Sequence, residues 1–332
     1  MPYCINTIIQ FAPACQDPFT KMLPLVDAAG AWYGASMTTP TRERPPLQAD
    51  LALLCAVLAI STGSIFVRWA DSHALVTAAY RLGLAVALIA PLAVWRARGE
   101  LWSLSVRDWG WAGLSGLFLA FHFATWISSL RYTSVANSVV LVNTVPIWVA
   151  LLTPWVTQDR IAARTWQSVG LSVLGGVLVG AGDWALSGQA LLGDALALAG
   201  SLGLAGYVLL GRRLRSRLSL VAYVTVCYGS AAVLLWAVVG ASRLPITGFS
   251  AGTWGALLGM ALISQHVGHS GYNYALRFFS ASLIAVTLLG EPILSTVWAY
   301  FLFDEGLTWL QGTGGVLILL AIYLAASAAS RK

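Results

Sequence analysis

Charged side chains are scarce in this sequence, and lysine is almost absent. Only 10% of the 332 residues are charged, whereas 58% are hydrophobic. Soluble domains carry about 25% charged residues, so this composition excludes an ordinary soluble protein. The four cysteines show no metal-ligand spacing, and we assign them no chemistry. No nucleotide-binding motif is present, which excludes an ATP-driven pump, and we expect no cofactor and no metal.

Long apolar stretches fill the chain from about residue 50 to residue 328, and the charges cluster in the short breaks between them. Each stretch has the length of about 17–25 residues that a helix needs to cross the hydrocarbon core. Runs such as Leu51–Ile60 are continuously apolar rather than alternating, which favours helices over barrel strands. We therefore predict an all-α integral membrane protein with ten transmembrane helices, at residues 50–70, 75–95, 109–130, 134–154, 166–184, 190–211, 219–240, 252–274, 281–303 and 308–328.

Lys and Arg are unequally distributed between the predicted loops. With the N-terminus in the cytoplasm, fifteen of them fall inside and only Arg68, Arg131 and Arg243 fall outside. Because Lys and Arg near span ends set the orientation, we expect both termini to be cytoplasmic. The basic residues thus have a topological explanation, and we expect no nucleic-acid partner. The excess of arginine over lysine indicates a GC-rich bacterial genome, and hence the plasma (bacterial inner) membrane.

The first 48 residues do not fit the pattern of spans. Ile5–Ala14 is apolar but too short to cross a membrane, and it lacks the positively charged start of a signal peptide. From Met37 the chain reads like an ordinary transporter start. We expect residues 1–48 to be a disordered N-terminal extension, with residues 1–36 upstream of the true start.

An internal repeat is the most informative feature of the sequence. Leu130–Ala136 recurs as Leu276–Ser282, and Pro146-Ile147 recurs as Pro292-Ile293, both at an offset of 146 residues. Because five spans is an odd number, the second copy is expected to insert upside down relative to the first. We therefore predict two five-helix inverted repeats, at residues 49–185 and 189–328, with the substrate site near the midplane at their interface.

The duplicated motif, in which Val145-Pro146-Ile147 is matched by Glu291-Pro292-Ile293 and followed by Asp304-Glu305, resembles the EamA-type members of the drug/metabolite transporter (DMT) superfamily. The resemblance covers roughly residues 50–328. It implies a ten-helix transporter with paired EamA domains, often an exporter of amino acids or other metabolites. The first copy has Gln158-Asp159 where the second has Asp304-Glu305, so the halves differ chemically at that end.

Ionisable side chains at bilayer depth are costly and mark candidate functional sites. Glu291 is the foremost of them, either as a proton carrier or cation ligand, or as a partner for backbone groups freed by Pro292. His122 and His269 lie at nearly equivalent repeat positions, so both are expected to face the shared interface. There they would handle substrate or protons, or form hydrogen bonds between helices. His266 precedes His269 by three residues, but no carboxylate lies nearby in that span, which disfavours a metal site.

Other polar and aromatic side chains lie inside the predicted spans. Arg81 either clamps a carboxylate substrate or pairs with Glu291 or a carbonyl group. The remaining candidates either line a substrate pathway or serve as ordinary contacts between helices. They are Trp126, Asn143, Trp298, Ser64 and Asn273.

Together these features predict a secondary transporter that exports a small amino-acid-like or drug-like solute by alternating access, with protons as the candidate coupling ion. Two alternatives stay open: a passive facilitator or channel, and an intramembrane enzyme that uses Glu291 and the histidines as acid and base. No nucleophile-elbow signature is present, so we do not expect an enzyme. Glycine runs at 176–180 and 255–259 indicate close helix packing and leave a homodimer open.

Overall fold

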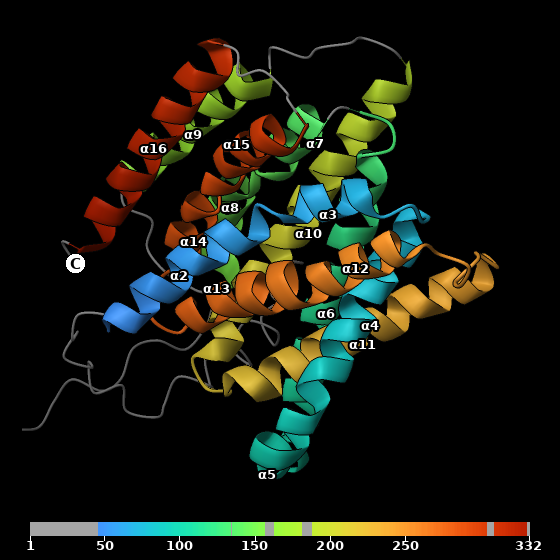
Figure 1. Cartoon of the computed structure of the whole chain (residues 1–332). Helices are drawn as coiled ribbons and strands as arrows, with labels where there is room; N and C mark the ends of the chain where they lie inside the picture. Colours follow the sequence, from blue (N-terminus) through green and yellow to red (C-terminus); the bar gives the residue numbers. More distant parts are fainter. Residues whose placement is uncertain (1–45, 134, 157–162, 181–187, 304–308, 331–332) are drawn as a thin grey trace, which may run out of the picture. The chain divides into compact units, whose positions relative to one another are not determined.

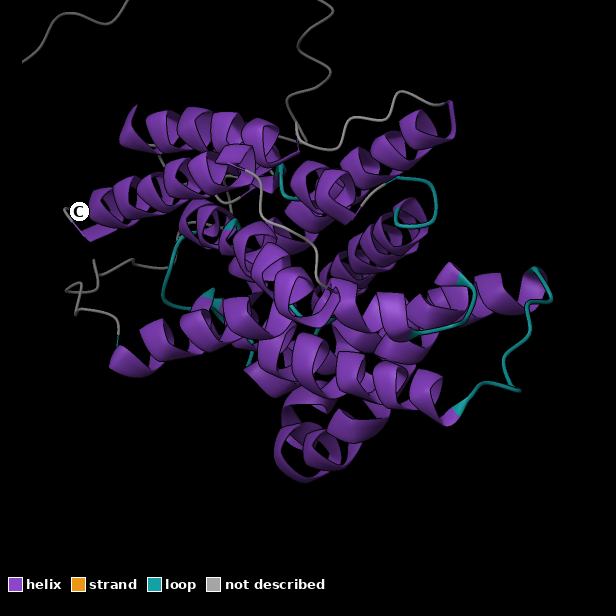
Figure 2. Ribbon diagram, turned by 45° about the horizontal axis from the view of Figure 1, so that its top comes forward, coloured by secondary structure: helices purple, strands orange, loops and turns teal. Residues whose placement is uncertain are grey.

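The regular structure of this chain is helical. The computed structural model describes residues 46–133, 135–156, 163–180, 188–303 and 309–330, and no strand occurs in these ranges (Figures 1 and 2). They belong to one unit of the chain, residues 45–332. The extension predicted for residues 1–48 lies almost wholly outside the described residues, and the first described helix begins at Leu47.

Helical segments occupy each of the predicted spans, as far as these are described. In the first half they are α2 (Leu47–Ile60), α3 (Gly63–Trp69), α4 (Ala74–Leu92), the π-helical segment η2 (Ala93–Ala97), α5 (Arg98–Ser103), α6 (Val106–Ser129), α7 (Val135–Val142), α8 (Val145–Val156) and α9 (Ala163–Gly180). In the second half they are α10 (Gly188–Arg215), α11 (Leu220–Ala241), α12 (Ala251–Gly259), the π-helical segment η4 (Met260–His269), α13 (Ser270–Ala275), α14 (Ala281–Thr287), α15 (Gly290–Phe303) and α16 (Trp309–Ser330).

Seven helices of the described chain are long and apolar enough to cross a membrane, judged by length and composition alone. They are Leu47–Trp69, Ala74–Ser103, Val106–Ser129, Ser138–Val156, Gln189–Arg215, Leu220–Ala241 and Ala281–Leu302. The spans predicted at 166–184, 252–274 and 308–328 are not among them, so the count of ten stays a prediction. The helical stretch around 252–274 contains Gln265, His266, His269 and Asn273, which make it more polar than a typical span.

Serine side chains set the starts of several helices. Ser105, Ser219, Ser250 and Ser280 each stand just before a helix, and each hydroxyl accepts a hydrogen bond from the backbone N–H three residues further on. A serine at this position satisfies one of the free N–H groups of the first turn, which is why it is favoured there. These residues fix where α6, α11, α12 and α14 begin.

Two spans are broken at matching places, one in each half of the chain. α7 and α8 are separated at Asn143-Thr144, and α14 and α15 at Leu288-Leu289. In both cases a proline, Pro146 or Pro292, lies in the first turn of the second helix. Proline is tolerated there because its missing N–H would have had no partner, whereas further into a helix it would disrupt the hydrogen bonds. The duplicated proline therefore gives both halves a discontinuous span.

The packing partners of the two halves correspond to one another. α6 packs against α10, and α2 packs against η4 and α13. In the repeat, η4 and α13 are the counterparts of α6, and α2 is a counterpart of α10. The second contact is therefore the repeat equivalent of the first. The contacts of α10 with α7 and α8 correspond in the same way to those of α15 with α2 and α3. Two further pairs join counterparts directly, α4 with α11 and α9 with α16 (Figure 1). The two halves thus use the same surfaces on each other.

Glycines allow the closest of these helix contacts. A methyl group on Gly116 of α6 would lie 2.4 Å from the carbonyl oxygen of Cys227 on α11. One on Gly175 of α9 would lie 2.7 Å from the carbonyl oxygen of Gly314 on α16. In a membrane the lipid tails are as apolar as the helix surfaces, so the hydrophobic effect does not drive helices together. Small residues instead let two helices approach until their backbones are in contact. In the glycine run at 255–259, a methyl group on Gly259 would lie 2.6 Å from Cε1 of the Phe66 ring.

Candidate functional site

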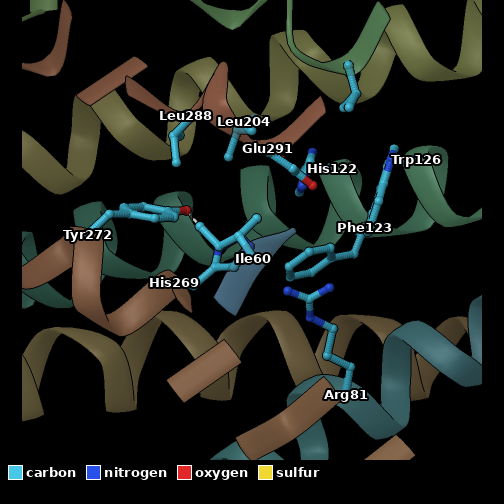
Figure 3. Close-up of a pocket in the computed structure, with 11 residues that line it drawn as sticks. Ile60, Arg81, His122, Phe123, Trp126, Leu204, His269, Tyr272, Leu288 and Glu291 are labelled. Atoms are coloured by element: carbon cyan, nitrogen blue, oxygen red, sulfur yellow. Dashed lines mark hydrogen bonds between the residues drawn. The ribbon is translucent and has the colours of Figure 1, made fainter. Parts of the chain in front are cut away.

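A small cavity lies between the two halves of the chain, and both halves contribute side chains to it (Figure 3). Five of its lining residues are polar or aromatic residues singled out in the sequence. The cavity is lined by Ile60, Arg81, His122, Phe123, Trp126, Val142, Leu204, His269, Tyr272, Leu288 and Glu291.

The lining repeats at the same offset as the sequence motif. Phe123 and His269 are 146 residues apart, and so are Trp126 and Tyr272. Val142 and Leu288, at the ends of α7 and α14 where the two spans break, form a third such pair. Three equivalent positions from each half therefore meet in one cavity, as expected when duplicated halves enclose a site at their interface.

The broken spans supply the polar groups at one side of the cavity. Asn143 lies in the break between α7 and α8, and its side-chain nitrogen donates to Oε2 of Glu291 at 3.4 Å. The same nitrogen also donates to the carbonyl oxygen of Val139 at 2.8 Å. Glu291 is in the first turn of α15, only 6% exposed, and its backbone N–H is bonded to Leu288. The helix break thus holds a buried carboxyl group against an amide from the other half.

The two buried histidines face each other across the interface. The ring centroids of His122 and His269 are 6.4 Å apart. Nδ1 of His122 lies 3.0 Å from the carbonyl oxygen of Gly200, which can only accept, so this nitrogen carries a proton. Nδ1 of His269 lies 2.7 Å from the hydroxyl of Tyr272. In a neutral His122 the other nitrogen, Nε2, is therefore the hydrogen-bond acceptor.

Arg81 enters the cavity from α4 and is 1% exposed. Its Nε donates to Oε1 of Gln265 at 2.8 Å, and its guanidinium carbon lies 4.0 Å from the centre of the Phe123 ring. Among the described residues it forms no ion pair, so the alternative pairing with Glu291 is not found, whereas the amide oxygen of Gln265 is a carbonyl partner. A buried ion costs several kcal/mol unless it is compensated, and a desolvated cation–π contact returns about 2 kcal/mol.

Besides Asn143, four candidates from the sequence lie outside the residues that line this cavity. Nε2 of His266 is 2.9 Å from the carbonyl oxygen of Ala85, and Asn273 donates to the hydroxyl of Tyr207. Nε1 of Trp298 donates to Oγ of Ser61 at 2.8 Å. Ser64 is buried, and its hydroxyl has no hydrogen-bond partner among the described residues. The first three thus hold helices together, and their assignment to the substrate pathway stays a prediction.

Sequence reasoning missed most of the apolar lining. The repeat offset itself would have identified two of these residues, because Phe123 corresponds to His269 and Tyr272 to Trp126. No signal distinguishes the remaining ones from other aliphatic residues of the spans. They are Ile60, Val142, Leu204 and Leu288.

Two predicted features of the sequence lie outside the described residues. Gln158-Asp159 and Asp304-Glu305, which distinguish the two halves in the sequence, fall outside the described ranges.

Within the described ranges, no group of three or more His, Cys, Asp or Glu side chains is placed so that it could hold a metal ion.

Comparisons with known proteins agree with the duplicated architecture. The model of the EamA-like transporter family matches twice, at residues 47–181 and 191–327. A solved structure described as "Crystal structure of protein" superimposes with a TM-score of 0.71 and 18% sequence identity, covering 86% of this chain and 99% of the other. At that identity the likeness concerns the fold alone. The search of curated proteins finds no match.

Proposed function

We propose a function on the premise that the chain belongs to the EamA-like transporter family, whose model it matches over both halves. It is an EamA-type protein of the drug/metabolite transporter superfamily and a multispanning membrane protein. We propose that it is a secondary transporter, which carries a small amino-acid-like or drug-like metabolite by alternating access through the cavity between its halves.

The observation that carries this proposal is the composition of the cavity. Its walls contain three pairs of residues at the repeat offset, and it lies where two spans are broken. In transporters built from inverted repeats, the substrate site lies near the bilayer midplane and is formed by discontinuous helices at the repeat interface. A cavity of this construction can open to either side when one half moves against the other.

The complete architecture that we propose has ten spans in two five-helix inverted repeats. The interchange of packing partners between the halves supports it, because a two-fold axis in the membrane plane would produce such a pattern. The three helical stretches that are not among the seven apolar candidates would then also cross the membrane. The distribution of Lys and Arg supports cytoplasmic termini in a plasma (bacterial inner) membrane, and export is the direction that we propose.

Glu291 is the residue that we propose to carry the coupling proton. Among the described residues that line the cavity, it is the sole acid. Carboxyl groups in chains of Asp, Glu and His serve as proton relays in membrane transporters, and His122 and His269 lie in the same cavity. Asn143 would hold the carboxyl group in place while its protonation changes.

Solute flux into liposomes tests this function. We expect purified protein to accumulate at least one labelled amino acid or small metabolite against its gradient when a pH gradient is imposed, and a protonophore to collapse the accumulation. Empty liposomes are the control. An absence of flux for every metabolite class would contradict the transporter proposal. Flux that ignores the pH gradient would instead support a facilitator, and chemical conversion of a solute in detergent would support an enzyme.

A further inference from the structure

We infer that the Arg81 side of the cavity is a binding site for the carboxylate of the transported solute. This inference rests on the proposed transport function and specifies its substrate class. The solute would be a small molecule with one carboxylate and an apolar remainder.

The guanidinium of Arg81 is held in position but is not saturated with partners. Its Nε is bonded to Gln265, and one face rests on Phe123, as Figure 3 shows for Arg81 and Phe123. The two contacts together fix the plane of the group. The two terminal nitrogens have no hydrogen bond to a described residue. Arginine stays charged in proteins, and its planar fork matches a carboxylate through two parallel hydrogen bonds. A buried guanidinium with both terminal nitrogens available in a cavity is therefore a binding site for a planar anion.

Gln265 is the side chain that orients Arg81. Gln265 is 0% exposed, and its Oε1 accepts a hydrogen bond from Nε of Arg81 at 2.8 Å. Oε1 of Gln265, rather than Nε2, faces the guanidinium because Arg81 can only donate. Gln265 is not among the residues that line the cavity, so it holds the guanidinium in place and does not itself contact a solute.

No carboxylate of the described residues forms an ion pair with Arg81 in the cavity. Glu291 is the sole acid in the described part of the lining, and its carboxylate is hydrogen-bonded to Asn143 rather than to Arg81. The remaining wall combines aliphatic side chains, such as Ile60, Leu204 and Leu288, with the rings of Trp126, Tyr272 and the two histidines. These surfaces favour an apolar group over a second charge.

Matched pairs of ligands that differ only in the carboxylate test the inference. The probes are leucine and leucinamide, phenylalanine and phenylalaninamide, and 4-methylpentanoate and 4-methylpentanamide, with binding measured by calorimetry on protein in nanodiscs. We expect at least one carboxylate to bind about 30-fold or more tightly than its amide, as is typical when one partner of a buried charge pair is removed. Sodium chloride at the same concentration should not compete.

Two variants at Arg81 assign the preference to this side chain. Arg81→Gln should abolish the discrimination between carboxylate and amide, whereas Arg81→Lys should retain part of it, because an ammonium keeps the charge but cannot form two parallel hydrogen bonds. The exposed Arg98 of α5 provides the control Arg98→Gln, which should leave the discrimination unchanged. The ratio of two affinities in one preparation does not depend on the folded fraction, so a partly unfolded variant still gives an answer.

Several outcomes would overturn the carboxylate site. They are binding of none of the three carboxylates, equal binding of carboxylates and amides, competition by chloride, and unchanged discrimination in Arg81→Gln. Transport of amides or amines without a preference for carboxylates would also overturn it, yet it would leave the transporter proposal standing. The transporter proposal itself fails only when no solute of any class is carried.

Discussion

Replacing Glu291 with glutamine is expected to abolish proton-driven solute accumulation while leaving the fold intact. Glutamine has nearly the same shape and can still accept a hydrogen bond from Asn143, but it cannot take up and release a proton. Coupling between two ligands typically changes an affinity by about 5- to 150-fold. Without this coupling, the accumulation driven by a pH gradient should decrease by a factor of that size, to the level of empty liposomes. Exchange of labelled for unlabelled solute, which needs no net proton movement, should persist.

The measurement compares gradient-driven uptake with exchange in the same liposomes. Asp50→Asn is the matched control, because Asp50 is an exposed carboxylate in the first turn of α2 and lies outside the cavity. It should leave both activities unchanged. If Glu291→Gln retained full uptake driven by the pH gradient, Glu291 would not be the proton carrier.

Adding a single methyl group at Gly116 is expected to destabilise the protein strongly. The methyl carbon would lie 2.4 Å from the carbonyl oxygen of Cys227 and 2.8 Å from Cβ of Ser230. The first of these contacts is with backbone, so α6 and α11 would have to move apart. Overpacking of this kind costs about 1–3 kcal/mol, which exceeds the gain of about 0.5–1 kcal/mol that alanine normally brings over glycine in a helix.

Gly110, on the same helix, provides the control for that experiment. It is exposed, and a methyl group there would meet no atom within 4 Å. Gly110→Ala should therefore be neutral or slightly stabilising, whereas Gly116→Ala should lower the midpoint of thermal or denaturant unfolding in detergent. Equal midpoints for the two variants would show that α6 and α11 do not approach as closely as described.

The duplication made a large part of the site predictable from the sequence. Pro146 and Pro292 occur at equivalent positions because both halves need a broken span, and the breaks lie beside the cavity. Polar residues at bilayer depth are expensive and therefore conspicuous, which is why Glu291, Arg81 and the two histidines of the cavity could be identified without a structure.

Other features could not be predicted, for physical reasons. The π-helical segment η4 changes which residues share a face, so the three-residue spacing of His266 and His269 does not show that His266 reaches the backbone of Ala85. Aliphatic residues such as Leu204 and Ile60 are indistinguishable by type from those that face lipid. Their place in the cavity depends on tertiary packing alone.

The central claim is that the cavity between the halves is the solute site and opens alternately to both sides of the membrane. Cysteine labelling at Leu204 tests it, in a variant whose four native cysteines have been replaced. Leu202→Cys on the same helix is the control, because Leu202 is 42% exposed on the outer surface of the helix bundle and should be unreactive in lipid. Membrane-impermeant thiol reagents are applied to right-side-out and inside-out vesicles, with and without transported solute.

Leu204→Cys is predicted to react from both sides, and saturating solute is predicted to slow both reactions. Leu204 is 5% exposed and lines the cavity, so the reagent reaches it only when the cavity opens toward the side on which the reagent is applied. Lack of labelling from one or both sides, or labelling that solute does not slow, would contradict alternating access through this cavity.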